Sequence, residues 1–258
     1  MKNILYKSFA LLAAGLMLGS CDENAIEDHN EPVNGGAFIK FVHAAPAAPA
    51  VNFMLDNTKI SALAANSAGE EQGLGYTTIS VFPLSYGYAN VPSGAYTLQA
   101  MSPATVGAGV VSNSSVTLNE GAYYTNFLLG EAEGFSNFLV EDNLPEADYS
   151  KSYIRFVNLA KNFPADYDAE AVRTATSETP ETRTVIGTDV AYKGNTAYVA
   201  IEAQGSYVVE FKTQNAAGEP VTIKSSSFTP TAGRVYTYTL RGDLATTAAV
   251  SHILFRDR

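Results

Sequence analysis

Apolar and polar residues alternate along most of the chain in short runs. In Ala37 to His43, Phe38, Lys40 and Val42 fall on one side and the residues between them on the other, which is the periodicity of a β-strand. Runs such as AYTLQAM, AYYTNFLL, SYVVEFK and RVYTYTL follow the same pattern, and clusters of Gly, Pro, Asn and Ser separate them. We find no sustained apolar stripe at helical spacing with caps at its ends. The pattern predicts an all-β protein.

An internal repeat divides the chain. Three pairs of similar segments begin at residues 38 and 153, 93 and 204, and 119 and 231, so the offsets are 115, 111 and 112 residues. Constant order at nearly constant spacing indicates tandem copies of one domain. We expect domains over residues 37–147 and 148–258, each with seven or eight short strands. That strand density predicts two tandem immunoglobulin-like antiparallel β-sandwich domains, although the chain has no Trp and no Cys pair for an immunoglobulin-type core.

The stretch FVHAAPAAPAVNFMLDN, residues 41–57, carries a lone histidine followed by two Ala-Pro steps. Proline interrupts strands and favours extended geometry in the residue before it. We therefore expect a stiff extended link between a strand ending near His43 and another starting near Val51, and such a link could carry the chain between two sheets.

This stretch, with YGYANVPSGAYTLQA and VTLNEGAYYTNFLLG further on, resembles DUF4397, a family of domains of unknown function. The resemblance covers nearly all of the first copy. The second copy keeps the strand patterns but has NLAKNFPADYDAEAV in place of the Ala-Pro signature. The resemblance implies exported, tandem, immunoglobulin-like domains and implies no activity.

The N-terminus predicts export and lipid attachment. Residues 1–20 combine Lys2 and Lys7 with a short apolar core, as secretory signal peptides do. Leu18 to Cys21 resembles the lipobox of bacterial lipoproteins, in which the cysteine is acylated, and Cys21 is the chain's only cysteine. Residues 21–36 are acidic and polar and end in Gly-Gly, which is typical of a flexible tether. Acidic residues after the acylated cysteine resemble the surface-export signals of Bacteroidetes lipoproteins.

These features predict a lipoprotein anchored in the outer membrane, displayed on the cell surface or alternatively facing the periplasm. The membrane is the expected partner, through the lipid. With 26 Asp and Glu against 16 Lys and Arg, the formal net charge is −10, and so we expect no nucleic-acid partner.

The sequence carries no recognisable catalytic constellation. It has no zinc-ligand spacing, no nucleophile elbow and no phosphate-binding loop, so we predict no cofactor, no metal and no catalytic residue. We interpret His43 as a strand-end residue that bonds local backbone; Asn158 is its counterpart in the second copy. The carboxylates of residues 166–170 are interpreted as a solvated acidic loop, with a weak calcium site as the alternative.

The tyrosines are the remaining ligand candidates. Tyr86 with Tyr88, and Tyr236 with Tyr238, could form flat aromatic platforms on strand faces; the alternative is that they line the sandwich cores. We predict a non-enzymatic binding, adhesion or structural module with a glycan or protein ligand. The alternatives are a glycan-binding subunit of a nutrient-capture system, and a hydrolase with an acidic pair of perturbed pKa in a cleft between the domains.

Overall fold

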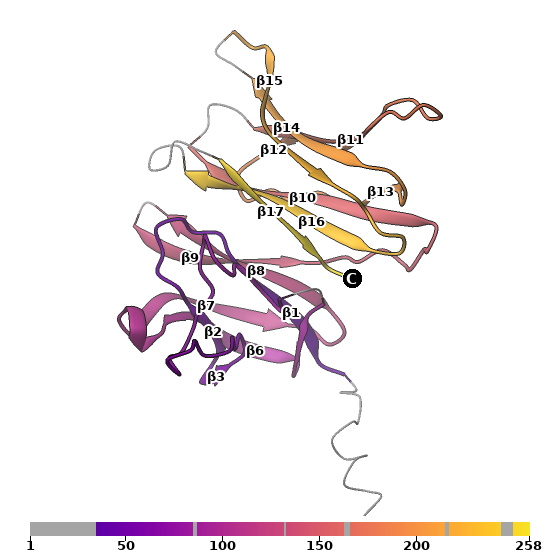
Figure 1. Cartoon of the computed structure of the whole chain (residues 1–258). Helices are drawn as coiled ribbons and strands as arrows, with labels where there is room; N and C mark the ends of the chain where they lie inside the picture. Colours follow the sequence, from indigo (N-terminus) through magenta and orange to yellow (C-terminus); the bar gives the residue numbers. More distant parts are fainter. Residues whose placement is uncertain (1–34, 85–86, 132, 163–165, 215–216, 244–249) are drawn as a thin grey trace, which may run out of the picture. The chain divides into compact units, whose positions relative to one another are not determined.

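The structure is a computed structural model that describes residues 35–84, 87–131, 133–162, 166–214, 217–243 and 250–258. The signal peptide, Cys21, His29, all but the end of the tether, and Tyr86 lie outside these residues. Over the described part of the chain, no helix has the length and apolar character needed to cross a membrane. The backbone is almost entirely β, as predicted (Figure 1).

The first half of the chain forms two sheets. The first inner sheet runs in the order β4-β1-β8-β9, with β5 also paired to β1; its strands are β1 (Ala37–His43), β4 (Val81–Phe82), β5 (Ala89–Val91), β8 (Tyr123–Glu131) and β9 (Gly134–Glu141). The first outer sheet runs β3-β2-β6-β7; its strands are β2 (Asn52–Leu55), β3 (Thr58–Lys59), β6 (Gly94–Ser102) and β7 (Gly109–Leu118). A single 3-10 turn, η1 (Ala104–Val106), lies between β6 and β7.

The second half repeats this plan. The second inner sheet runs β13-β10-β16-β17; its strands are β10 (Lys151–Lys161), β13 (Val199–Glu202), β16 (Val235–Asp243) and β17 (Ser251–Arg256). The second outer sheet runs β12-β11-β14-β15; its strands are β11 (Tyr167–Arg173), β12 (Thr182–Val190), β14 (Tyr207–Gln214) and β15 (Pro220–Phe228). Each half buries its own apolar core between its inner and outer sheets, and the exact boundary at residue 147 stays a prediction.

Residue-by-residue equivalence between the halves follows from the strand registers. Phe38 pairs with Tyr123 across β1 and β8, and Tyr153 pairs with Val235 across β10 and β16. The same core hydrogen bond recurs in both halves, because the hydroxyls of Tyr124 and Tyr236 each accept a backbone N–H from the residue five positions earlier, at 3.1 and 2.9 Å. The sequence offsets thus correspond to matching positions in the two sheets.

One feature of the sheets differs from the prediction. The central pairs β1·β8 and β10·β16 are parallel, although the other pairs are antiparallel. Both faces of the inner sheets are covered, and parallel pairing is typical of strands buried on both sides. In β1, accordingly, six of seven residues are buried, including Lys40 and Val42 on the side that faces away from the first core.

The Ala-Pro segment carries the chain from β1 in the inner sheet to β2 in the outer sheet, as expected. It is less extended than predicted, because the amide of Ala48 donates to the carbonyl of Ala45 at 3.3 Å in a turn. His43 is fully buried, and its Nε2 lies 3.0 Å from the carbonyl oxygen of Pro49. This contact agrees with the interpretation of His43 as a strand-end residue that bonds local backbone.

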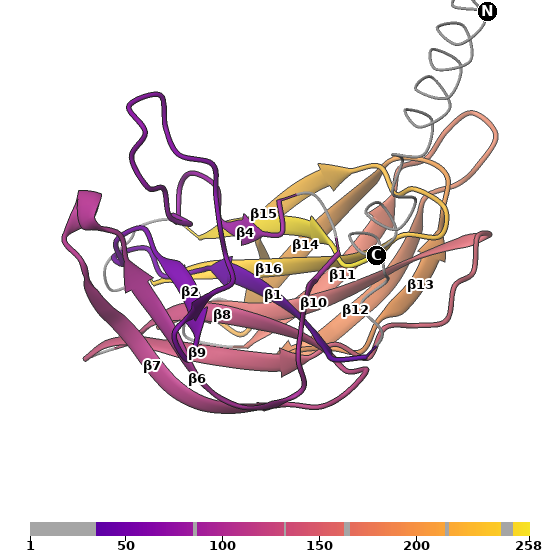
Figure 2. The same ribbon diagram turned by 90° about the horizontal axis from the view of Figure 1, so that it is seen from below.

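Four sheets are stacked within residues 35–258 (Figures 1 and 2). The outer sheets form the two outside layers, and the inner sheets face each other between them. Side chains from both inner sheets form a third apolar cluster, which contains Val42, Ala44, Phe127, Leu129, Val140, Val157, Leu159 and Phe255. We call this contact between the inner sheets the seam.

Candidate functional site

One end of the seam holds buried charged groups. The carboxylate of Asp142, which directly follows β9, accepts a hydrogen bond on Oδ1 from Nη2 of Arg155 in β10, at 2.5 Å. Its Oδ2 accepts hydroxyl donors from Thr125 and Tyr88 of its own half, at 2.5 and 2.8 Å. The guanidinium of Arg155 comes from the opposite half, so this ion pair crosses the seam.

The second half reproduces the same arrangement. The carboxylate of Asp257 pairs through Oδ1 with Nζ of Lys40, at 3.0 Å, and Lys40 lies in the opposite half. Its Oδ2 accepts the hydroxyls of Thr237 and Tyr198 from its own half, at 2.5 and 2.9 Å. We call these eight residues the seam network: Lys40, Tyr88, Thr125, Asp142, Arg155, Tyr198, Thr237 and Asp257.

Cations and aromatic rings alternate in this network. Nζ of Lys40 lies 4.6 Å from the ring centroid of Tyr88, and Cζ of Arg155 lies 4.7 Å from that of Tyr198. Both distances are within the range of a cation–π contact. Two cations and two carboxylates are buried together, and each charge has a partner of opposite sign.

Burial governs the protonation behaviour of the network. It lowers the pKa of Lys40, and the Asp257 carboxylate opposes that shift. It raises the pKa of Asp142; the Arg155 guanidinium opposes the rise and the Asp257 carboxylate adds to it. Burial also raises the pKa of the Tyr88 and Tyr198 hydroxyls, which therefore remain donors. For Arg155, burial works to lower the pKa, but Asp142 and its other neighbours hold it above its ordinary value.

Asp142 and Asp257 are the two carboxylates that the structure buries where the halves meet, which is where the hydrolase alternative places an acidic pair. Both are almost fully buried, at 3% and 1% exposure, and in each residue one oxygen is held by a cation and the other by two hydroxyls. A general acid or base must reach a proton on the substrate. These carboxylates are instead engaged by the protein itself, and their geometry is that of a structural network.

A groove of about 730 Å³ opens beside the seam network. Two of its lining rings, Phe38 and Tyr123, are stacked with centroids 4.6 Å apart, and Tyr88 meets Tyr123 edge-on at 5.1 Å. The lining also contains Glu141, Glu146, Arg234 and Arg258 beside Leu144 and Pro145. One nitrogen of Arg258, Nη2, is buried and has no hydrogen-bond partner. We call this the aromatic groove; its volume lies within the usual range of ligand sites.

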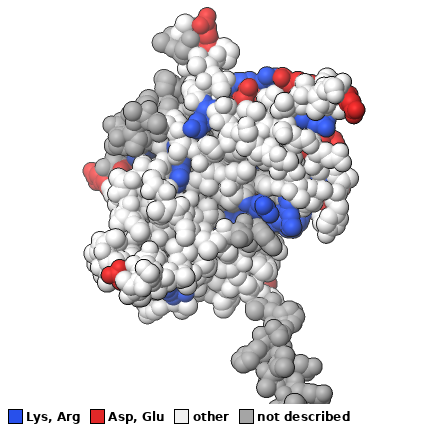
Figure 3. Space-filling view, viewed as in Figure 1, with Lys and Arg blue, Asp and Glu red and all other residues white. Residues whose placement is uncertain are grey.

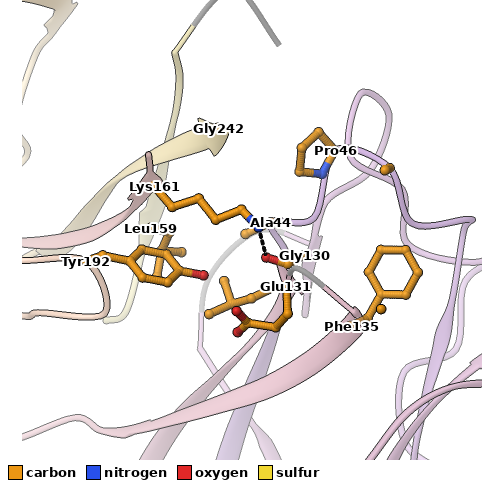
Figure 4. Close-up of a pocket in the computed structure, with 12 residues that line it drawn as sticks. Ala44, Pro46, Gly130, Glu131, Phe135, Leu159, Lys161, Tyr192 and Gly242 are labelled. Carbon is orange, nitrogen blue, oxygen red and sulfur yellow. Dashed lines mark hydrogen bonds between the residues drawn. The ribbon is translucent and has the colours of Figure 1, made fainter. Parts of the chain in front are cut away.

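A smaller cavity of about 190 Å³ lies near the other end of the seam (Figure 4). Ala44, Pro46 and Ala47 of the Ala-Pro segment line it together with Phe135 and Tyr192. Nζ of Lys161 donates across the seam to the carbonyl of Gly130 at 2.7 Å, and Nζ of Lys193 pairs with Glu131, also at 2.7 Å. The family-like segment thus borders a contact between the halves.

The structure describes three of the four predicted tyrosines. Tyr236 and Tyr238 lie in the second core at 4% and 0% exposure, so neither ring presents an open platform. Tyr88 lines the aromatic groove, but its hydroxyl belongs to the seam network; its proposed partner Tyr86 lies outside the described residues. Tyr236 and Tyr238 therefore line the core, as the alternative interpretation holds. Tyr88 instead contributes to the groove together with Phe38 and Tyr123.

The structure describes His43, His252 and the acidic segment at residues 166–170. His252 lies in β17 and is far from His43 of β1 in the sequence. Burial lowers the pKa of both imidazoles. The prediction of a loop is wrong for residues 167–170, which belong to β11. Glu170 forms ion pairs with Lys212 and, at 3.2 Å, with Arg183. No cluster of potential metal ligands occurs among the residues that the structure describes.

The aromatic groove and the seam network were not predicted from the sequence. A signal for the network exists, since Lys40 and Arg155, and also Asp142 and Asp257, occur at the repeat offset of 115 residues. A charged residue kept at equivalent strand positions in both copies indicates a shared contact. Figure 3 shows one face of the molecule, on which exposed charged side chains are scattered over a mostly uncharged surface.

Comparison with solved structures gives weak likenesses at low identity. A leucine-rich repeat protein from Bacteroides thetaiotaomicron matches 80% of this chain with 11% identity and a TM-score of 0.21, and the chain spans 26% of that protein's length. A family 26 carbohydrate-binding module from Eubacterium rectale, solved with maltoheptaose, matches 85% of this chain and 97% of its own, with 9% identity and a TM-score of 0.25. A candidate cell adhesion protein from Bacteroides uniformis matches 88% and 99%, with 12% identity and a TM-score of 0.29. Likenesses this weak carry no argument about a ligand.

At the level of sequence, comparison with curated proteins finds no match. The family profile of DUF4397, a domain of unknown function, matches residues 37–166, which are 130 of the 258 residues. The match covers the whole first half and continues through β10 into the second, beyond the boundary expected at residue 147. The chain therefore belongs to the DUF4397 family.

Proposed function

We propose that this protein is a lipid-anchored, non-enzymatic binding module of the bacterial cell envelope, displayed on the cell surface, and that the aromatic groove is its ligand site. The observation that carries the proposal is the groove itself. Its stacked rings of Phe38 and Tyr123 stand directly over a buried network that ties the two halves together. A site on a rigid base loses little conformational entropy on binding.

The groove contains the residue types that ligand sites use. Aromatic rings supply large contact area with few rotatable bonds, and Glu141 and Arg258 add an acceptor and a donor at the same surface. Because Nη2 of Arg258 has no partner within the protein, a ligand oxygen that accepts from it would satisfy a buried donor. An unsatisfied buried donor is costly, so this contact would favour binding.

We propose a glycan as the more specific candidate for the ligand of the aromatic groove. Sugar rings offer apolar faces for stacking and hydroxyls that both donate and accept, and the groove combines rings with carboxylates and guanidinium groups. A glycan-binding subunit of a nutrient-capture system would fit this combination. A protein ligand would instead use the same rings as hot-spot contacts.

Binding can be tested by titrating the isotope-labelled chain with neutral oligosaccharides and, separately, with extended peptides, following the backbone amide NMR signals. We expect perturbations at Phe38, Gly121 and Tyr123, and a Tyr123→Val variant that binds at least 10-fold more weakly. Tyr149→Ala is the matched control, since Tyr149 is 81% exposed and does not line the groove. The groove would not be the ligand site if neither the oligosaccharides nor the peptides bind, or if the Tyr123→Val variant binds with the same affinity as the unaltered chain.

The lipid anchor rests on the sequence around Cys21, and it has its own test. In the bacterial host, metabolic labelling with a fatty-acid analogue should mark the chain, and Cys21→Ser should remove the label and release the protein from the membrane fraction. Protease treatment of intact cells separates the two locations: a surface protein is digested, whereas one facing the periplasm is protected.

A further inference from the structure

The seam network has two-fold internal symmetry. Each half supplies one cation, one carboxylate, one threonine and one tyrosine at equivalent positions of its inner sheet, and each cation pairs with the carboxylate of the other half. In an isologous interface the same surface occurs on both sides, so every contact between two residues recurs between their equivalents. The pairs Lys40–Asp257 and Arg155–Asp142 have this relationship. Such interfaces are the usual way in which two copies of one protein form a dimer.

Contacts across the seam are made by side chains. Among the described residues, every strand pair joins strands of the same half. No backbone–backbone hydrogen bond between these residues joins one half to the other. Side chains reach across instead, as Lys161 does to the carbonyl of Gly130 and Arg241 does to the carbonyl of His43. The halves can therefore separate and dock again without the rupture of any sheet.

The other end of the seam has lost the symmetry and now distinguishes the halves. Arg241 in β16 occupies the position of Leu129 in β8, and its guanidinium donates to the carbonyls of His43 and Tyr76 at 2.8 and 2.9 Å while it stacks on the Tyr76 ring at 3.8 Å. Two first halves facing each other would place Leu129 against those carbonyls and leave them without this donor. The seam therefore favours a first half paired with a second half.

We propose that the seam is a docking surface that a second copy of this chain can complete. The first half of one molecule packs on the second half of another, and the reverse contact forms at the same time, so that the dimer contains two seams. Each of these seams has the same contacts as the single seam of the monomer. The linker, residues 142–150 between β9 and β10, decides between the two forms, since docking within one chain has the higher effective concentration when this segment is long enough to let the seam close.

The linker length provides a direct test. Lys151 lies four residues before Arg155 in β10, about 13 Å along the strand from the residue that contacts Asp142. Deleting residues 143–148 leaves two residues between Asp142 and Lys151, which reach at most about 11 Å. The chain with this deletion cannot close its own seam, and we expect it to elute as a dimer with twice the monomer mass by light scattering.

Two charge variants in the deleted chain show whether the seam holds the dimer together. Lys40→Glu places two carboxylates opposite each other and should raise the dimer dissociation constant at least 100-fold. Adding Asp257→Lys restores an opposite-charge pair and should recover most of the lost affinity. A deleted chain that is monomeric with a native circular dichroism spectrum, or a dimer that both charge variants leave unchanged, would overturn the proposal.

The unaltered chain offers a second measurement if the deleted chain does not fold. Isotopically light and heavy batches are mixed at high concentration, warmed below the unfolding transition, and diluted for native mass spectrometry. Exchange of halves predicts dimers of mixed mass, and Arg241→Leu should make them form sooner, because a weaker seam opens more often while monomer and dimer lose the same contacts. Absence of any mixed dimer in this experiment would overturn the proposal on its own.

Discussion

The two halves of the chain share a plan of strands, although their sequences differ at most positions. Equivalent strands, a parallel central pair and the seam network occur in both. Three of the differences lie at the ends of the seam, where Tyr123 of the first half corresponds to Val235 of the second, Leu129 to Arg241, and His43 to Asn158. The shared positions join the halves to each other, and the divergent positions create the aromatic groove and the directional contacts. Substitutions that convert one half into the other separate these roles.

The largest expected effect comes from the shared carboxylates. Asp142→Ala leaves Arg155 buried without its partner, and Asp257→Ala does the same to Lys40; loss of one partner from a buried ion pair costs about 3–5 kcal/mol. Because the network is two-fold, the two variants should lose similar free energies of unfolding, measured by urea denaturation. Lys59→Ala, which breaks the exposed pair with Glu71 and leaves the bond from Asn52 to that carboxylate in place, should cost less than about 1 kcal/mol. A strongly unequal loss between the two aspartates would contradict the symmetry.

The next effect comes from Arg241→Leu, which installs the first-half residue in the second half. The carbonyls of His43 and Tyr76 lose a charged donor, and unsatisfied buried groups cost about 1–3 kcal/mol. We expect a loss of about 2 kcal/mol in the free energy of unfolding. Arg183→Leu is the control, since Arg183 is exposed, and it should be nearly neutral. Equal stability of the Arg241 variant and the unaltered chain would show that this contact adds nothing.

His43→Asn makes the first half resemble the second and should alter the dependence of stability on pH. Burial lowers the pKa of His43, the positive charge of Arg241 lowers it further, and the bond to Pro49 opposes both. Between that lowered pKa and the unfolded value near 6.5, the unfolded chain binds a proton that the native chain does not, so stability falls as the pH drops through this window. His252 contributes with the same sign.

Denaturation at pH 7.5 and pH 5.5 measures this effect. The unaltered chain should lose about 1 kcal/mol more between the two pH values than His43→Asn does. His252→Asn should also reduce the pH dependence, and the double variant should show a weaker dependence than either single variant. Identical pH dependence of the unaltered chain and His43→Asn would mean that the imidazole is accessible to protons in the native state.

The smallest effect on stability is expected from Tyr123→Val, which installs the residue of the second half. It removes the stack with Phe38 and the edge contact with Tyr88, and aromatic pairs contribute about 0.5–1.5 kcal/mol. Both rings are only partly buried, so we expect a change in thermal midpoint of a few degrees, followed by calorimetry. A large loss of stability would identify this stack as part of the core rather than as a ligand surface.

Much of the fold could be predicted from the sequence, because alternation and repetition are local signals. The strands, the repeat and the crossing from β1 to β2 after His43 all follow from them. The parallel central pairs could not be predicted, since strand order depends on contacts far apart in the chain. Residues 167–170 contain charged side chains that suggest a loop, whereas their backbone pairs with β12 on one side and β14 on the other.

The seam could not be predicted from the sequence either, because it also depends on contacts between residues far apart in the chain. Lys40 alternates with apolar residues and looks like a solvent-facing position, and only the opposite half shows that it is buried against Asp257. The aromatic groove combines residues from several separate segments, including Phe38, Tyr88 and Tyr123. Pairs of tyrosines two residues apart drew attention to Tyr236 and Tyr238, whose side of β16 faces the second core.

Differential scanning calorimetry of the mature chain tests most directly whether the seam makes the two halves one unit. Our account predicts a single unfolding transition whose calorimetric and van't Hoff enthalpies agree. The Asp142→Ala/Asp257→Ala double variant should unfold at a lower temperature and separate into two transitions. Two independent transitions in the unaltered chain would contradict the account, because the halves would then be stable separately and the seam would contribute little to either.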